Sequence, residues 1–192
     1  MSYHLYQTRG FILKSFDVGE ADKLFHIFTE DLGLVAVRAQ AVRKQISKLR
    51  PSLREYTFSR FVLVRGKNTW RLTDVFETVS LGSGKAEKLK IVASLFALVR
   101  RFVQGEEENK ELFRMLFESF EFLRSEDLSK DELSSFEAVA VLKILSSLGY
   151  IGESKASGFI GESFSRDMLF RSSFFRREFL REINQALDVS HL

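Results

Sequence analysis

The sequence predicts an α+β protein in which a five-stranded β-barrel over residues 1–80 is followed by an all-α domain over residues 81–192. Apolar residues recur with a period of two in the first part and of about 3.6 after the Gly-Ser-Gly stretch at 82–84. Charge divides the chain in the same way. Residues 1–80 hold 13 Lys and Arg against eight Asp and Glu, whereas the remainder holds 16 against 18. We therefore expect a basic barrel joined to a nearly neutral helical domain.

Five runs in the first domain have the composition and alternation of strands. The segments between them are rich in turn-forming residues, and Gly66 and Asn68 suit a tight turn. Five short strands with hairpin connections fit a small closed barrel. The runs are TRGFILKSF (8–16), KLFHIFT (23–29), LVAVRAQA (34–41), TFSRFVLVR (57–65) and WRLTDVFET (70–78).

Four segments of the second domain have helical periodicity, which predicts a bundle. They are residues 85–105, 109–125, 128–150 and 172–187. Ser129 is expected to cap the third helix. In the first helix the pattern places Leu89, Val92, Phe96 and Val99 on one buried face, and in the fourth it aligns Phe175, Phe179, Ile183 and Leu187.

One segment of the barrel is strongly basic. This basic segment, residues 37–54, has no acidic residue within it, since none lies between Asp31 and Glu55. Pro51 favours a loop, although a short helix over 40–49 would also fit the composition. Lys and Arg neutralise phosphates and release counterions, so we predict a nucleic-acid-binding surface here. Its cationic residues are Arg38, Arg43, Lys44, Lys48, Arg50 and Arg54.

A purely structural interpretation of the basic segment remains open. Its charges could face solvent, or pair with acidic residues elsewhere such as Glu30, Asp31 and Glu55. Binding of single strands also needs exposed aromatic side chains on which bases stack. The candidates are Phe16, Tyr56, Phe58 and Trp70. Each is more often a core residue, and Trp70 is the first to test.

Composition and motifs exclude several kinds of chemistry. The chain has no cysteine, which removes disulfides and thiolate metal sites. The three histidines, His4, His26 and His191, lack metal-ligand spacing. Glu20 and Asp22 are expected to cap backbone amides or pair with Lys23 instead of forming a catalytic pair. We therefore expect no enzyme, no cofactor, no metal and no small-molecule substrate.

The sequence shows no apolar run long enough to span a bilayer and no signal peptide at its N-terminus. We therefore expect no membrane association and a cytoplasmic protein.

The first part of the chain also contains an ordered set of small and polar residues, whose members are Thr8, Gly10, Gly19, Glu20, Asp22, Gly33, Leu34, Ala39 and Arg43. In order and spacing this set resembles the N-terminal segment of the RecO family of bacterial recombination and repair proteins. There a Thr-x-Gly strand leads to a GE.D turn, an apolar strand, a GL turn and a basic loop. The similarity continues through residues 49–66.

A second resemblance to this family lies at residues 144–161, ILSSLGYIGESKASGFIG. It is similar to a helix end followed by a CxxCG turn, which holds structural zinc in many members. Here Ser157 and Ile160 stand at the cysteine positions, and only Gly161 is retained. The region near 157–161 is therefore expected to be a degenerate zinc finger without metal.

The resemblance implies an OB-fold barrel followed by a helical domain, in a nucleoid-associated protein. It implies a non-enzymatic mediator that binds single- and double-stranded DNA and anneals complementary strands. With RecR, such a protein helps load RecA onto DNA covered by single-strand-binding protein (SSB). By resemblance the six cations of the basic segment would face DNA, with Lys14 and Lys23 as additions. The acidic tail of SSB would meet cations of the helical domain, namely Arg166, Arg171, Arg176, Arg177 and Arg181.

Two other functions remain open from the residues alone. The barrel could be a protein-interaction adaptor that docks an acidic partner and never contacts DNA. It could also be an RNA-binding OB protein, which a comparison of DNA and RNA would identify, because only RNA offers 2′-hydroxyls. A nuclease is the weakest alternative.

Overall fold

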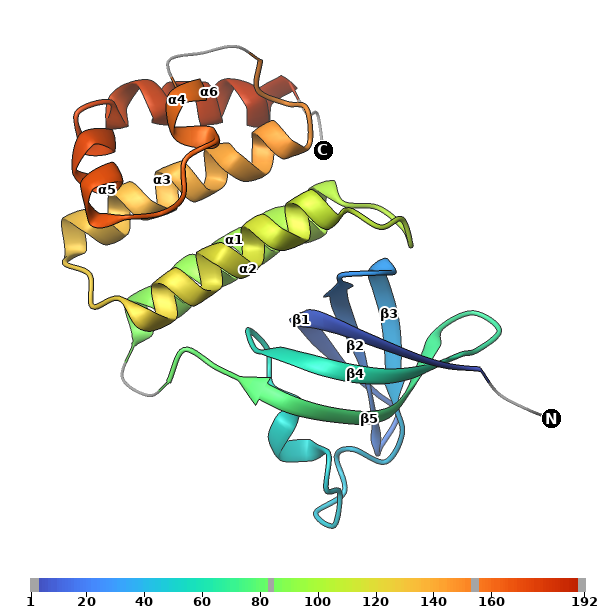
Figure 1. The fold of residues 1–192 in the computed structure, drawn as a ribbon. Coiled ribbons are helices and arrows are strands. Elements are labelled where there is room, and N and C mark those ends of the chain that lie inside the picture. Colours follow the sequence, from blue (N-terminus) through green and yellow to red (C-terminus); the bar gives the residue numbers. More distant parts are fainter. Residues whose placement is uncertain (1–3, 83–84, 153–155, 190–192) are drawn as a thin grey trace. The chain divides into compact units, whose positions relative to one another are not determined.

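The computed structural model describes residues 4–82, 85–152 and 156–189 (Figure 1). The chain forms two compact units. The barrel unit comprises residues 1–82 and 96–110, and the helical unit comprises residues 83–95 and 111–192. Ser83 and Gly84 of the expected linker, and His191, lie outside the described residues. A domain boundary at residues 80 and 81 stays a proposal.

Five strands close into a mixed barrel in the order β1-β2-β3-β5-β4, which confirms the predicted OB-type fold. All pairings are antiparallel except the one between β3 and β5, which is parallel, and β1 closes the barrel by pairing with β4. The strands are β1 (Leu5–Val18), β2 (Asp22–Thr29), β3 (Gly33–Ala39), β4 (Phe58–Arg65) and β5 (Trp70–Val79).

The barrel interior is filled by alternating apolar side chains from all five strands, such as Phe25, Val37 and Phe61. Gly10 is buried within β1, where a Cβ would lie 2.9 Å from the Ile27 side chain. Gly10 therefore lets β1 approach β2 closely, which gives a physical reason for glycine in the Thr-x-Gly element.

Gly33 begins β3 in a left-handed conformation, with φ of +67°. A Cβ at this position would lie 2.2 Å from the carbonyl oxygen of Glu107, in the segment that follows helix α1 (Ala86–Phe102). The amide of the next residue, Leu34, donates to the carbonyl of Gly105 at 3.2 Å. Glycine is thus required both by the turn and by the docking of residues 105–107 on the barrel.

The helical unit is built around α3 (Lys130–Ser147), which packs against the three helices that follow it. Ser129 caps α3 as predicted, and Glu132 completes a capping box with it. Phe136, Val139, Ala140 and Leu145 of α3 are buried. The other helices of this part of the chain are α2 (Lys110–Ser125), α4 (Ser157–Ile160), α5 (Arg166–Ser173) and α6 (Arg176–Val189).

Two helical predictions are wrong. Leu89 is 43% exposed, because its neighbour Lys88 takes the buried direction. The Lys88 ammonium donates to the carbonyl oxygens of Leu123 and Glu126 at the end of α2, and successive helix residues point about 100° apart.

The single helix expected over residues 172–187 is instead divided between α5 and α6, with a break at residues 174–175. The hydroxyl of Ser165 caps α5 at the amide of Met168, and this start was not recognised from the periodicity. Phe179 and Ile183 are buried as expected, whereas Phe175 is 37% exposed.

Candidate nucleic-acid interface

The basic segment runs from the end of β3 into the connection to β4 and is anchored on the barrel by apolar side chains. Val42 and Leu53 are buried members of the barrel core, and Leu49 packs against it. No helix forms over residues 40–49, which adopt turns; the only helical turn in the described connection is η1 (Arg50–Ser52). Because these three apolar side chains pack on the barrel, the cationic side chains between them remain exposed.

Asp22 holds the start of the connection. Its carboxylate accepts hydrogen bonds from the Ala41 amide at 2.8 Å and from Arg38 Nε at 2.9 Å. These two donors, the amide first, hold the pKa of Asp22 below its ordinary value. The expectation that Asp22 caps an amide is confirmed, but its cationic partner is Arg38, and Lys23 pairs with Asp17 instead.

Glu55 holds the end of the connection. It accepts from the amide and hydroxyl of Ser15 at 2.8 and 2.9 Å, and pairs with Lys14 at 3.2 Å. The next residue, Tyr56, donates its amide to the Ile12 carbonyl at 2.8 Å. Glu55 therefore pairs with β1, and no bond joins it to a cation of the basic segment among the residues described.

A cavity of about 280 Å³ at the base of the connection collects cations from separate segments. Lys23, Arg43 and Arg50 line it, with Asp17 as the one acidic residue. Asp17 pairs with Lys23 at 3.3 Å and with Arg43 at 3.4 Å, so one carboxylate is shared by two cations. With three cations against one carboxylate, the lining keeps an excess of positive charge that suits a phosphate group.

The tip of the connection carries two further cations. A turn is closed by a hydrogen bond of 3.1 Å from the Ser47 amide to the Lys44 carbonyl. Lys44 at its start and Lys48 just beyond its end are both exposed. Neither they nor Arg50 and Arg54 form an ion pair with any residue that the structure describes.

The six predicted cations therefore do not form a uniform set. Arg38 pairs with Asp22 at 2.7 Å. Arg43 pairs with Asp17, whose carboxylate it shares with Lys23. The other four are exposed side chains without such a partner in the described chain. What the sequence did not indicate is the role of Asp17, which lies 26 residues before Arg43.

Of the aromatic candidates, Trp70 is only 2% exposed and belongs to the barrel core. Its indole Nε1 donates to Glu106 at 3.1 Å, so it is not available for stacking on bases. Tyr56 and Phe58 are partly buried. Phe16 is the exposed member of the set, at 41%.

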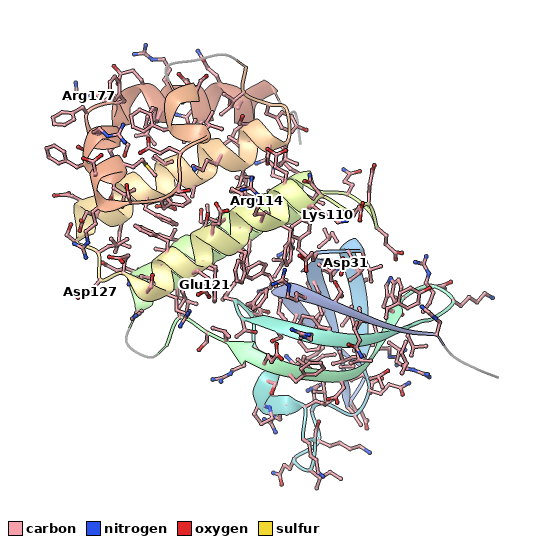
Figure 2. The ribbon with its side chains drawn as sticks, in the orientation of Figure 1. Asp31, Lys110, Arg114, Glu121, Asp127 and Arg177 are labelled. Carbon is pink, nitrogen blue, oxygen red and sulfur yellow. The ribbon has the colours of Figure 1, made fainter. Side chains whose placement is uncertain are left out.

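The five arginines expected in the helical domain fall into two groups. Arg166 pairs with Glu126 and Glu132, and Arg171 pairs with Glu162 and Asp167. The other three, Arg176, Arg177 and Arg181, are exposed on α6. Figure 2 shows Arg177 on the outer side of the helical unit.

Two of these arginines line a hollow with apolar side chains. The hollow has a volume of about 600 Å³, and its lining residues are Ser173, Phe174, Arg176, Arg177, Glu178 and Leu180. Phe174 is 69% exposed. Two arginines stand against the single carboxylate of Glu178, so the lining keeps one net positive charge beside apolar side chains.

The region at 157–161 has no ligands for zinc. Ser157 and Ile160 lie in the short helix α4, whose buried residue is Phe159. Phe159 is 8% exposed and lies with its ring 5.8 Å from that of Phe175 and 5.5 Å from that of Phe179. Apolar packing therefore holds the positions at which the sequence resembles a CxxCG turn. Over the described ranges, no three His, Asp or Glu residues gather as a metal site.

No helix among the described residues is long and apolar enough to cross a membrane.

Comparisons with known proteins place these features in a family. A family model described as "Recombination protein O N terminal" matches residues 1–80, and one described as "Recombination protein O C terminal" matches residues 84–186.

Relatives in several bacteria carry the name DNA repair protein RecO. That of Clostridium novyi (strain NT) is 30% identical over 159 residues, which cover 76% of this chain and 57% of the relative. That of Clostridium acetobutylicum is 30% identical over 149 residues, with 76% and 59% covered. That of Trichodesmium erythraeum (strain IMS101) is 31% identical over 141 residues, with 72% and 49% covered. The chain thus spans about half to three fifths of the length of these relatives. Because matches to both family models cover most of the sequence, the chain belongs to the RecO family of recombination proteins.

Proposed function

We propose that this chain is a non-enzymatic DNA-binding protein of recombination and repair, which holds single- and double-stranded DNA on the basic segment of its barrel. The observation that carries this proposal is the set of exposed cations fixed on a small barrel. Lys44, Lys48 and Arg50 are exposed without ion-pair partners in the described part of the chain. Membership in the RecO family supports DNA as the ligand over an acidic protein.

The mechanism is electrostatic. Two complementary strands repel each other through their phosphates, and a shared cationic surface lowers that repulsion by displacing counterions. Strands held side by side pair faster, although no covalent bond forms or breaks. Annealing by this route requires cations that remain exposed, which the anchored connection between β3 and β4 provides.

Partners follow from the family and from the surface of α6. Arg176 and Arg177, which outnumber Glu178 in the lining beside Phe174 and Leu180, suit the acidic tail of SSB. RecR and RecA complete the assembly in which such a protein exchanges SSB for the recombinase. These partners are part of the proposal, and their support lies in family membership and in the chemistry of the α6 surface.

Charge variants of the basic segment test the proposal. Reversing Arg43 and Lys44 to Glu should reduce affinity for a labelled single-stranded oligonucleotide at least tenfold and slow annealing, because four units of charge are removed near the phosphates. Asp17→Asn provides a matched control that should change the affinity in the opposite direction. It removes the carboxylate shared by Lys23 and Arg43, so affinity should rise.

Unchanged binding and annealing in the folded double variant would contradict this surface. An RNA oligonucleotide of the same sequence is the second control. Tighter binding of RNA than of DNA would favour the alternative of an RNA-binding barrel.

A further inference from the structure

The tip of the basic segment presents an apolar side chain to solvent. Ile46 is 88% exposed, the highest value for a large hydrophobic residue in the part of the chain that the structure describes. It is the third residue of the turn closed between Lys44 and Ser47. A β-branched side chain at the apex of a polar turn gains nothing from burial within this chain, which calls for an explanation.

The fold holds this side chain outward. Two successive hydrogen bonds of 3.1 Å, from Lys44 to Ala41 and from Ser47 to Lys44, define the backbone before and around the apex. On either side of the turn, Val42 and Leu49 pack on the barrel core. The turn is therefore supported at both ends, and a ligand that contacts Ile46 meets a side chain whose backbone is already ordered.

The surroundings indicate the chemistry of that ligand. Cations flank the apex on both sides, with Arg43 and Lys44 before it and Lys48 after it, and no acidic residue lies in the basic segment. A ligand that satisfies both features carries negative charge next to apolar surface. Nucleic acid has this arrangement, because phosphates run beside the faces of the bases. Proteins that bend or unstack DNA use apolar wedges flanked by basic residues in the same way.

We propose that Ile46 is a base-contacting wedge, which inserts against or between neighbouring bases of DNA whose phosphates are held by the flanking cations. This inference rests on the proposed function and adds a role to it. The cations supply affinity that is independent of sequence, whereas Ile46 keeps adjacent bases apart and exposes their pairing edges to a second strand. The basic segment would then prepare a strand for annealing as well as hold it.

A fluorescent base analogue measures unstacking separately from binding. We would titrate the protein into a single-stranded oligonucleotide that contains 2-aminopurine, whose emission rises when its neighbours no longer stack on it. Wild-type protein should raise this emission. Ile46→Ala should lose most of the rise and bind about three- to tenfold more weakly, with an unchanged salt slope, because its cations remain.

Gln45→Ala is the matched control, since Gln45 is the exposed neighbour within the same turn. It should behave as wild type in both measurements. If Ile46→Ala gives the same emission rise as wild type, or if the wild-type protein binds without any rise, the wedge is excluded while DNA binding stands. If the wild-type protein does not bind the oligonucleotide even at low salt, the proposed function itself fails.

Discussion

Asp22 helps to determine which cations of the basic segment remain without an ion-pair partner. By binding the Ala41 amide and Arg38, it fixes the first turn of the connection between β3 and β4 and uses one of the six cations to do so. Arg38 therefore has a structural role, while Lys44 and Lys48 stay exposed nearby in sequence. Residues with the same charge differ in function because their neighbours in space differ.

The depressed pKa of Asp22 makes a prediction about pH. A carboxyl group with a lowered pKa in the folded state stabilises the fold when it is ionised. That contribution is complete above the ordinary value of 3.8 and is lost as pH falls through the lower folded-state pKa. Asp22→Asn lacks the contribution at every pH. The difference in unfolding free energy between wild type and Asp22→Asn should therefore shrink on acidification below about pH 4.

Trp70 provides the measurement for this comparison. It is the single tryptophan of the chain and is buried in the barrel, so its fluorescence reports unfolding of the barrel unit. Denaturant titrations from neutral pH to about pH 2.5 should show the two free energies converging. A difference that stays constant over this range would show that the ionised carboxylate contributes nothing.

At the scale of elements, α4 is held by apolar packing at the positions where the sequence resembles a CxxCG turn. Removal of its buried aromatic side chain should be costly. We expect Phe159→Ala to lower the stability of the helical unit by about 3 kcal/mol, because the substitution leaves a cavity between Phe175 and Phe179. The loss should appear as a lower midpoint in thermal unfolding followed by circular dichroism.

Phe170→Ala on α5 is the control for that substitution, since Phe170 is 65% exposed. Its effect should stay within about 0.5 kcal/mol. A chelator should leave the midpoint of the wild-type protein unchanged, because the chain has no thiolate ligands. Destabilisation by the chelator, or a neutral Phe159→Ala, would contradict the account of apolar packing at this turn.

The elements also show which structural features a sequence reveals. Alternation located all five strands, since buried residues such as Val35, Val37 and Ala39 occupy every second position of β3. Periodicity did not locate the break between α5 and α6, because the apolar spacing continues across it. It also gave no sign that Lys88 would be buried, which depends on the carbonyl groups at the end of α2.

For the candidate site, the cations of the basic segment could be predicted from the sequence, but their carboxylate partners could not. A run without acidic residues identified the basic segment, because unbalanced charge is visible locally. The pairs that divide its cations are not local. Asp22 lies 16 residues before Arg38, and the carboxylate of Asp17 on β1 reaches Arg43, just beyond β3, because β2 pairs with both β1 and β3. Exposure of Ile46 likewise depends on the turn that carries it.

At the scale of the whole molecule, both family models match although the chain covers only about half to three fifths of the relatives' length. The barrel with its basic segment and the helical unit with its α6 surface are both present. The proposal that matters most concerns the barrel: we propose that its basic segment binds DNA phosphates.

The most direct test is the salt dependence of oligonucleotide binding, measured by fluorescence anisotropy of a labelled single strand. Four to six phosphate contacts predict a slope of about −3 to −4 in a plot of log affinity against log salt concentration. Replacing Arg43, Lys44, Lys48 and Arg50 by Ala should make the slope shallower, with a magnitude of about 1 or below. Absence of binding at low salt, or equal slopes for the two proteins, would contradict the account and leave only the fold in common with the family.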